Sequence, residues 1–468
     1  MTFGIPVIVL FSSLEFVLCF LPVALILHST LPGIVRPLLL VAMSCLFYIW
    51  GEHYYSVTIF FLSVVNYILG RQCDPTSRYS KGFCVAGFVI NIGALILFKY
   101  VPWSDFHPQS RFGTYGVKFF GHLPLGISFF TFHSLAYISD IRSGLVGKHS
   151  YIQYLNYLTL FPHSIAGPIV RFSEINRFFV NRLRSAKDIE DGLSMFVFGL
   201  SRKLLIADQV AVIPDSTFSP LIGELDVMAS WIGAVAYSIQ IYFDFSGYSL
   251  MAIGLAKCFG YEFPKNFDQP YLATSISDFW RRWHISLGAW FRDYVYIPLG
   301  GSRAGTSRTS INLFMVFLIT GIWHGSGLNF LVWGAFYGAL IVIERFWPVG
   351  RLNPFLRGIA VYFLTLVGWV IFRSNDLEAV GQYLMSMIDV RRIAEVPMNH
   401  YLTNSSIIAL FAGLVVTFGY EPHIARTTGI NAKPTKATIN KIGVLLLFCV
   451  CLYLMSAATS SPFLYFRF

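Results

Sequence analysis

The chain has 468 residues and a net charge of +10, and 55% of its residues are hydrophobic, 17% aromatic and only 12% charged. A soluble protein of this length would divide into about three domains and would be far more polar. The composition therefore excludes an ordinary soluble protein and indicates an integral membrane protein.

Apolar segments recur along nearly the whole chain. They cover residues 5–27, 37–50, 85–97, 231–243, 311–320, 359–372, 407–416 and 442–454. Several approach the ~20 residues that a helix needs to cross a bilayer. We therefore expect an all-α polytopic membrane protein with roughly ten to twelve transmembrane or re-entrant helices. Because the polar stretches between the apolar segments are short, we expect one integral membrane domain over residues 1–468.

The basic residues are spread among the apolar segments and form no stripe with interleaved aromatics, so we expect no nucleic-acid partner. The positive-inside rule explains them, and it predicts that the basic clusters lie in cytoplasmic loops. These clusters are 71–81, 171–187, 281–308 and 426–441. The first apolar segment has no Lys or Arg before it, since Arg36 is the first basic residue, so it is expected to remain as a helix rather than act as a cleaved signal peptide.

The middle of the chain is more irregular than its ends. Proline and glycine interrupt apolar sequence at Pro124, Gly126, Pro162, Gly167, Pro168 and Gly247. Irregular backbone at membrane depth must be shielded from lipid or must line a cavity. We therefore expect a catalytic core over about residues 120–335, and peripheral packing helices over 1–100 and 340–468.

The segment 277–287, SDFWRRWHISL, combines Asp278, two arginines and His284 with three large aromatics. One interpretation is an interfacial helix whose tryptophans and arginines meet lipid headgroups. The other is a cytoplasmic mouth where Arg281, Arg282, or the nearby Arg292 or Arg303, binds the phosphates of an activated acyl donor, since the guanidinium fork pairs bidentately with phosphate.

The segment 321–327, GIWHGSG, places His324 directly after an apolar run. Ionisable side chains inside a bilayer are costly and usually face the bundle interior for a functional reason, although a packing histidine is the alternative. The neighbouring glycines would leave room for a substrate beside the ring. His324 is therefore the first candidate for a catalytic group.

A polar seam runs through the apolar segment 239–248, IQIYFDFSGY. Gln240 and Asp244 are four residues apart and share one face of a helix. They could form hydrogen bonds between helices, or Asp244 could orient a catalytic imidazole as a carboxylate does in hydrolase triads.

Other common site chemistries have little support. The seven cysteines show no CxxC spacing and are interpreted as small buried hydrophobic residues, so neither zinc nor a disulfide framework is expected. There is no HExxH-like pattern and no GxSxG, so no metal site and no serine-hydrolase elbow are predicted.

Several segments together resemble the membrane-bound O-acyltransferase family, specifically the branch that includes the membrane subunit of bacterial alginate O-acetylation. They cover most of the chain from about residue 120 onward. They are PLGISFFTFH (124–133), FPHSIAGPIVR (161–171), GLSRKLLIAD (199–208), YFDFSGY (242–248), FPKNFDQPY (263–271), DFWRRWH (278–284), RDYVYIPLGGSR (292–303), WHG (323–325) and SPFLYFRF (461–468).

The resemblance implies helices around a central tunnel in a bacterial inner membrane. It implies acetyl transfer from cytoplasmic acetyl-CoA, with no permanently bound cofactor, toward a polysaccharide acceptor such as alginate or cellulose, through periplasmic acetyltransferase partner proteins. The family's membrane histidine corresponds to His324, and its second histidine to His284. His133 and His163 stand where glutamine is expected, and Leu250 where aspartate is expected; these departures bear on the choice of acceptor.

Alternatives remain open at this point. Peptidoglycan O-acetylation and teichoic-acid D-alanylation use similar membrane subunits. A channel or flippase would use the polar seam without chemistry, and an assembly scaffold of a polysaccharide secretion complex would need neither histidine.

Overall fold

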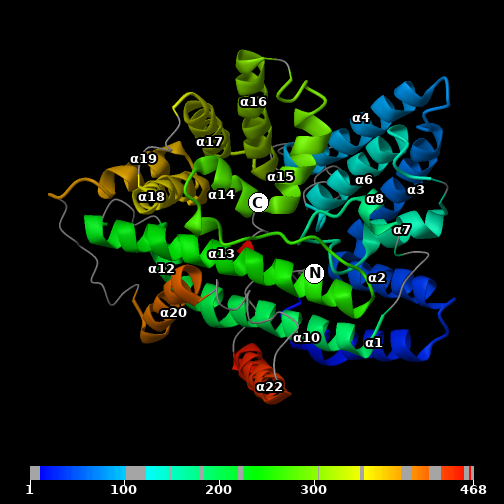
Figure 1. The fold of residues 1–468 in the computed structure, drawn as a ribbon, viewed down its shortest axis with the longest axis horizontal. Helices are drawn as coiled ribbons and strands as arrows, with labels where there is room; N and C mark the ends of the chain where they lie inside the picture. Colours follow the sequence, from blue (N-terminus) through cyan, green and yellow to red (C-terminus); the bar gives the residue numbers. More distant parts are fainter. Residues whose placement is uncertain are drawn as a thin grey trace, which may run out of the picture. The chain divides into compact units, whose positions relative to one another are not determined.

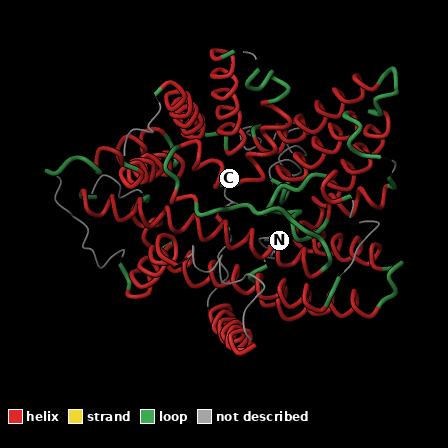
Figure 2. The backbone as a smooth tube through the Cα atoms, viewed as in Figure 1, coloured by secondary structure: helices red, strands yellow, loops and turns green. Residues whose placement is uncertain are grey.

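The computed structural model describes residues 11–101, 123–147, 149–176, 178, 184–219, 225–303, 305–347, 353–391, 402–420, 434–457 and 463–464. All regular structure within these residues is helical, as Figure 2 shows, and this confirms the predicted all-α class. The contacts between residues divide the chain into two compact units, one made of 1–196 and 251–264 and the other of 197–250 and 265–468. The predicted core over 120–335 contains parts of both units, and its extent stays a prediction.

The first unit contains the N-terminal helices (Figure 1). Its elements are the π-helical η1 (Phe16–Phe20), α1 (Leu21–Thr30), α2 (Arg36–Glu52), η2 (His53–Tyr55), α3 (Ser56–Gln72), α4 (Ser80–Lys99), α6 (Ile127–Arg142), α7 (Tyr151–Thr159), α8 (Phe172–Ile175) and most of α10 (Ala186–Ser201).

Helices α3, α4 and α6 pack against one another in this unit. The amides of Asn66 and Asn91 exchange two hydrogen bonds of 3.0 and 2.6 Å between α3 and α4. Gly70 lets α3 approach α6, because a Cβ atom there would collide with the Tyr137 ring. Small residues and paired amides of this kind hold helices together where lipid removes the hydrophobic driving force.

The irregular segment 161–170, between α7 and α8, is buried along its whole length within the first unit. The Tyr157 hydroxyl donates to the Val170 carbonyl over 2.9 Å, and the imidazole of His163 pairs with the Tyr157 carbonyl over 2.7 Å. This segment therefore meets the expectation that broken backbone is shielded by protein.

The second unit begins within α10 and holds the remaining helices (Figure 1). They are the π-helical η4 (Arg202–Ala207), α11 (Asp208–Val210), α12 (Val212–Thr217), most of α13 (Val227–Cys258), η6 (Pro270–Leu272), α14 (Ile276–Arg282), α15 (Ile285–Phe291), η7 (Arg292–Tyr296), α16 (Thr306–His324), α17 (Leu328–Phe346), α18 (Pro354–Arg373), α19 (Leu377–Ser386), α20 (Asn404–Val415), η10 (Val416–Tyr420) and α22 (Pro434–Ala457).

Helices α16 and α17 form a tight hairpin in this unit, α18 packs on α17, and α14 lies against α17. Gly321 permits the close approach of α16 to α17, since a Cβ atom there would collide with the Phe330 carbonyl oxygen. The hairpin turns directly after His324, where Gly325 takes an extended conformation. The turn therefore fixes the place of the candidate catalytic histidine.

Within the described residues, three helices are long and apolar enough to cross a bilayer: α4, α17 and α18. Shorter apolar helices cover Phe16–Thr30, Asn404–Gly419 and Lys441–Ala457. The larger number of ten to twelve crossings stays a prediction.

Candidate active site

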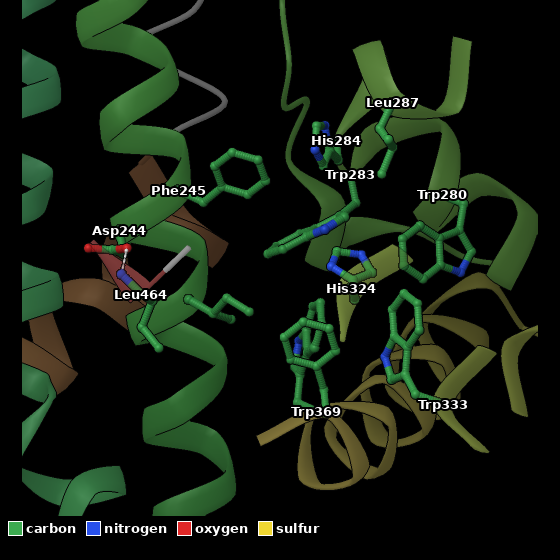
Figure 3. A pocket seen from close by; sticks show the side chains of 12 residues that line it. Asp244, Phe245, Trp280, Trp283, His284, Leu287, His324, Trp333, Trp369 and Leu464 are labelled. Carbon is green, nitrogen blue, oxygen red and sulfur yellow. Dashed lines mark hydrogen bonds between the residues drawn. The ribbon is translucent and has the colours of Figure 1, made fainter. Parts of the chain in front are cut away.

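One pocket in the second unit brings the two candidate histidines together (Figure 3). His324 comes from the end of α16 and His284 from the start of α15. The remaining lining is mostly apolar and aromatic, and it consists of Ile241, Asp244 and Phe245 of α13, Trp280 and Trp283 at α14, Leu287 of α15, Trp333 of α17, Trp369 and Phe372 of α18, and Leu464. A largely apolar pocket with a few convergent polar groups is the usual form of a small-molecule site.

His324 is buried among aromatic rings. Its imidazole lies 5.2 Å from the Trp333 ring and 5.1 Å from the Phe372 ring, both in edge-to-face geometry, and 4.7 Å from the ring of Trp323. These contacts come from three helices, so the ring is held in place by packing. Figure 3 shows it between the tryptophans and the α13 side of the pocket.

His284 is held by Asn266. The backbone of His284 takes the left-handed conformation, with φ 45° and ψ 54°, which is uncommon for a residue other than glycine. The Asn266 carbonyl accepts from the Ile285 amide over 2.9 Å, and its side-chain Oδ1 accepts from the Ser286 amide over 3.2 Å. These bonds hold the turn that carries the histidine.

The same amide sets the tautomer of His284. Since the Ser286 amide can only donate, the atom facing it is Oδ1, and Asn266 Nδ2 donates to the Ser249 hydroxyl over 3.0 Å. His284 Nδ1 lies 3.2 Å from the same Oδ1, so Nδ1 carries the hydrogen and Nε2 is the acceptor nitrogen. His284 lies outside the candidate spans, and burial lowers the pKa of its imidazole, so the ring is neutral near pH 7.

Glu344 of α17 anchors the short helix that carries the tryptophans. Its two carboxylate oxygens accept from the backbone amides of Ile276 and Ser277, each over 2.9 Å. The first amides of a helix have no partner within the helix, and a carboxylate there also meets the positive end of the helix dipole. This cap fixes α14, and with it Trp280, against α17.

Asp244 is part of a buried ion network. Its Oδ1 lies 2.8 Å from Lys203 Nζ, which also lies 2.7 Å from Asp208, and both Lys203 and Asp244 are 3% exposed. Its Oδ2 accepts from the Leu464 amide over 2.9 Å, a bond drawn in Figure 3. Lys203 Nζ also stands 4.7 Å from the centre of the Phe463 ring. The carboxylate therefore holds the backbone of Leu464, whose side chain lines the pocket.

The comparison with known families decides the identity of the fold. The model of the membrane-bound O-acyltransferase family matches residues 77–362, which is more than half of the chain. The chain belongs to the membrane-bound O-acyltransferase family. It is therefore a membrane protein and an acyltransferase, and this confirms the prediction made from the segments that resemble the family.

Bacterial proteins named as O-acetylases or O-acetyltransferases are similar to the chain over most of its length. The "Probable alginate O-acetylase AlgI" of Pseudomonas putida is 35% identical over 98% of this chain and 100% of the relative. The protein of the same name from Pseudomonas aeruginosa is 32% identical over the same shares. The "Peptidoglycan O-acetyltransferase" of Helicobacter pylori is 31% identical over 83% of this chain and 81% of the relative.

In this acyltransferase the predicted donor-binding arginines lie apart from the pocket lining. Arg281 and Arg303 are exposed, and Arg281 donates to the Ser277 carbonyl over 3.2 Å. Arg282 is paired with Asp278, with 2.9 Å between Nε and Oδ2. The two histidines are thus brought together, whereas the arginines are placed outside.

The two polar residues of the segment 239–248 are also placed differently with respect to the pocket. Asp244 lines the pocket, but its carboxylate is paired with Lys203 and with the Leu464 amide rather than with an imidazole. Gln240, one turn earlier, is buried and is not part of the lining. One of the two interpretations of Asp244 is that it orients a catalytic imidazole; at His284 the orienting group is the amide of Asn266.

The sequence indicated no individual role for four residues that structure the site: Asn266, Glu344, Lys203 and Leu464. A signal existed for three of them, because Asn266, Lys203 and Leu464 lie in segments that carry the family resemblance. Glu344 lies outside these segments, but a carboxylate within an apolar helix is costly and therefore calls for a partner. Within the described residues no cluster of three or more His, Cys, Asp or Glu side chains could hold a metal ion.

Proposed function

We propose that this acyltransferase transfers acetyl groups from cytoplasmic acetyl-CoA toward the hydroxyl groups of an exopolysaccharide, and that it does so in a bacterial inner membrane. The observation that carries the proposal is the pair of buried imidazoles in one tryptophan-lined pocket. The similarity to proteins named alginate O-acetylases supports the acyl group and the class of acceptor. Alginate and cellulose are the candidate glycans.

In the proposed reaction His324 is the general base. It takes the proton from an acceptor hydroxyl as that oxygen forms a bond to the thioester carbonyl carbon. The carbon–sulfur bond then breaks, and the departing thiolate recovers the proton from the imidazolium. The aromatic surroundings support this role, because they keep bulk water from hydrolysing the donor. General-base help of this kind contributes typically ~10²- to 10⁴-fold to the rate.

His284 acts beside it as a positioning group for the donor or the acceptor. Its neutral ring presents Nε2 as a hydrogen-bond acceptor, which suits an N–H or O–H group of a substrate. The alternative is that His284 supplies the proton to the leaving thiolate. The Nδ1 hydrogen is engaged by Asn266, so acceptance at Nε2 is the role we favour.

The wider transfer involves groups outside the pocket. We propose that periplasmic acetyltransferase proteins receive the acetyl group, that ten to twelve helices surround the tunnel through which it passes, and that the exposed Arg281 and Arg303 contact the phosphates of acetyl-CoA at the cytoplasmic surface. Exposure of these two guanidinium groups and their basic surroundings, residues 281–308, are consistent with such a contact.

The first test is acetyl transfer from radiolabelled acetyl-CoA by the purified full chain together with its operon-encoded periplasmic partners. We expect His324→Ala to reduce transfer by ~10²-fold or more. His53→Asn, which changes an exposed histidine of the first unit, is the control and should transfer normally. Normal transfer by a folded His324→Ala protein would show that His324 is not the general base and would assign that role to another residue.

The acceptor is tested by supplying alginate, cellulose or peptidoglycan in the same assay. The similarity to the Helicobacter pylori enzyme favours peptidoglycan as the second candidate. Label that appears on peptidoglycan alone would replace the exopolysaccharide in the proposal. A requirement for a D-alanyl donor in place of acetyl-CoA would instead favour teichoic-acid D-alanylation.

A further inference from the structure

Two tryptophans that line the pocket, Trp280 and Trp333, carry a buried indole N–H group that has no hydrogen-bond partner within the described residues. A buried tryptophan usually finds an acceptor for this group, and a buried donor left without one costs free energy. Trp369 in the same pocket follows the usual pattern, since its indole donates to the Tyr271 hydroxyl over 3.1 Å. An unsatisfied donor beside a pocket is a group that a bound ligand can satisfy.

Trp333 is the one of these two tryptophans whose ring contacts His324. The centroids of the two rings are 5.2 Å apart and their planes are nearly perpendicular, at 83°. Figure 3 shows the indole nitrogen of Trp333 on the edge of the ring that faces across the pocket toward Trp369, and that of Trp280 on the edge turned away from His324. An acyl group held beside His324 therefore lies next to the N–H group of Trp333.

The indole of Trp333 is fixed by aromatic rings on several sides. Its centroid lies 5.5 Å from that of Trp280 in α14, 5.3 Å from that of Tyr337 in α17 and 5.3 Å from that of Phe372 in α18, and the side chain is 1% exposed. These rings can offer the N–H group only a weak contact with their π electrons. The donor is thus held in place before a ligand arrives, which is the condition for strong electrostatic stabilisation of a transition state.

The proposed reaction creates a need for such a donor. When a hydroxyl oxygen adds to a thioester, negative charge develops on the carbonyl oxygen. His324 presents a lone pair to the hydroxyl, and His284 presents Nε2 as an acceptor. The Asp244 carboxylate also accepts hydrogen bonds. None of these three atoms can donate to the carbonyl oxygen, whereas an indole nitrogen can only donate.

We propose that Trp333 is a further catalytic residue, whose indole N–H group donates a hydrogen bond to the carbonyl oxygen of the acyl group; this inference rests on the proposed function. As the acceptor oxygen bonds to the carbonyl carbon, an electron pair moves onto the carbonyl oxygen and the hydroxyl proton passes to His324. When the carbon–sulfur bond breaks, that pair restores the carbonyl double bond and the thiolate takes the proton from His324. The indole keeps its hydrogen throughout.

The first test is Trp333→Phe in the full chain with its periplasmic partners, because this change keeps an aromatic ring and removes the N–H group. We expect kcat for acetyl transfer to fall by ~10²-fold, as for the loss of one donor to an oxyanion, and KM for acetyl-CoA to change much less. Trp347→Phe is the matched control. Trp347 follows the last residue of the same helix and is 76% exposed, so kcat should remain at the wild-type value.

A second measurement detects the hydrogen bond itself, since a packing defect could also lower kcat. The probe is a ketone analogue of acetyl-CoA in which a methylene group replaces the sulfur, so that its acetyl group cannot be transferred. Infrared spectroscopy follows the isotopically labelled carbonyl of the bound analogue. A hydrogen bond lowers the stretching frequency, so we expect a lower frequency in the wild type and in Trp347→Phe than in Trp333→Phe.

Two results would overturn the inference and leave the proposed function in place. One is a normal kcat in a folded Trp333→Phe protein, with folding checked by its melting curve. The other is a reduced kcat with an unchanged carbonyl frequency, which would assign the loss to packing. In both cases the wild type would still transfer acetyl groups and His324→Ala would not. Absence of transfer from acetyl-CoA by the wild type with its partners would instead overturn the proposed function, and this inference with it.

Discussion

Oδ1 of Asn266 accepts from Nδ1 of His284 over 3.2 Å while it also accepts from the hydroxyl of Ser286 over 2.8 Å. One amide therefore fixes both the tautomer of the imidazole and the backbone turn that carries it. A group that orients an imidazole in this way decides which ring nitrogen carries the hydrogen and which one accepts.

Replacing Asn266 with alanine is expected to reduce acetyl transfer by about tenfold to a hundredfold, because a misplacement of about 1 Å at a reacting group costs up to ~10²-fold. The loss should appear mainly in kcat. Asn266→Asp keeps acceptor oxygens at the same place and should retain more activity than Asn266→Ala. Steady-state kinetics of the three proteins check this, and an unchanged kcat in Asn266→Ala would contradict the positioning role.

Asp244→Asn should destabilise the protein by roughly 3 kcal/mol, since breaking a buried ion pair leaves its partner inadequately compensated. Lys203 keeps Asp208, so the loss should not be larger. The control is Asp191→Asn, which removes the partner of Lys257 in a pair whose side chains are 35% and 41% exposed. That change should cost less than about 1 kcal/mol. Melting temperatures in detergent compare the two, and equal shifts would show that the buried pair contributes no more than the surface pair.

Glu344→Gln removes the charge that caps α14 and leaves only one acceptor oxygen for the two amides. We expect a loss of about 1 to 2 kcal/mol, as for the removal of other helix caps. Acetyl transfer should also fall, since α14 carries Trp280 into the pocket. Glu378→Gln, an exposed glutamate in the first turn of α19, is the control and should change stability by less than about 0.5 kcal/mol. A stable Glu344→Gln protein with normal transfer would argue against the anchoring role.

Gly321→Ala should force α16 away from α17, because the added Cβ would collide with backbone that cannot rotate aside. The expected cost is about 1 to 3 kcal/mol, with displacement of the neighbouring His324 and loss of transfer. Gly381→Ala in α19 places the same methyl group in open space and should be neutral or stabilise the helix by up to about 1 kcal/mol. If both variants melt at the wild-type temperature, the close approach of the hairpin is not needed for stability.

The helical class and the two candidate histidines could be predicted from local features of the sequence, without knowledge of how the chain folds. An ionisable side chain in an apolar run is costly wherever the run packs, so His324 is conspicuous in the sequence itself. Two of the tryptophans that line the pocket with His284 lie within four residues of it in the sequence. The segment 277–287 therefore supplies several lining residues at once: Trp280, Trp283, His284 and Leu287. The arginines of the same segment do not line the pocket, because a helix that faces the pocket with one side exposes the other.

The amino-acid sequence by itself thus determined that the chain is a helical membrane protein and made His324 and His284 the candidate site residues. Hydropathy and the cost of a buried polar group act on each segment independently, and the family resemblance added His284. The tertiary structure decided which polar groups serve these residues. Asn266 meets His284 from 18 positions away, Glu344 caps α14 from 68 positions away, and Asp244 binds the Leu464 amide from 220 positions away. These partners are far apart in the sequence and meet only because the chain folds back on itself. A hydrogen bond depends on separation in space, and composition does not encode that separation.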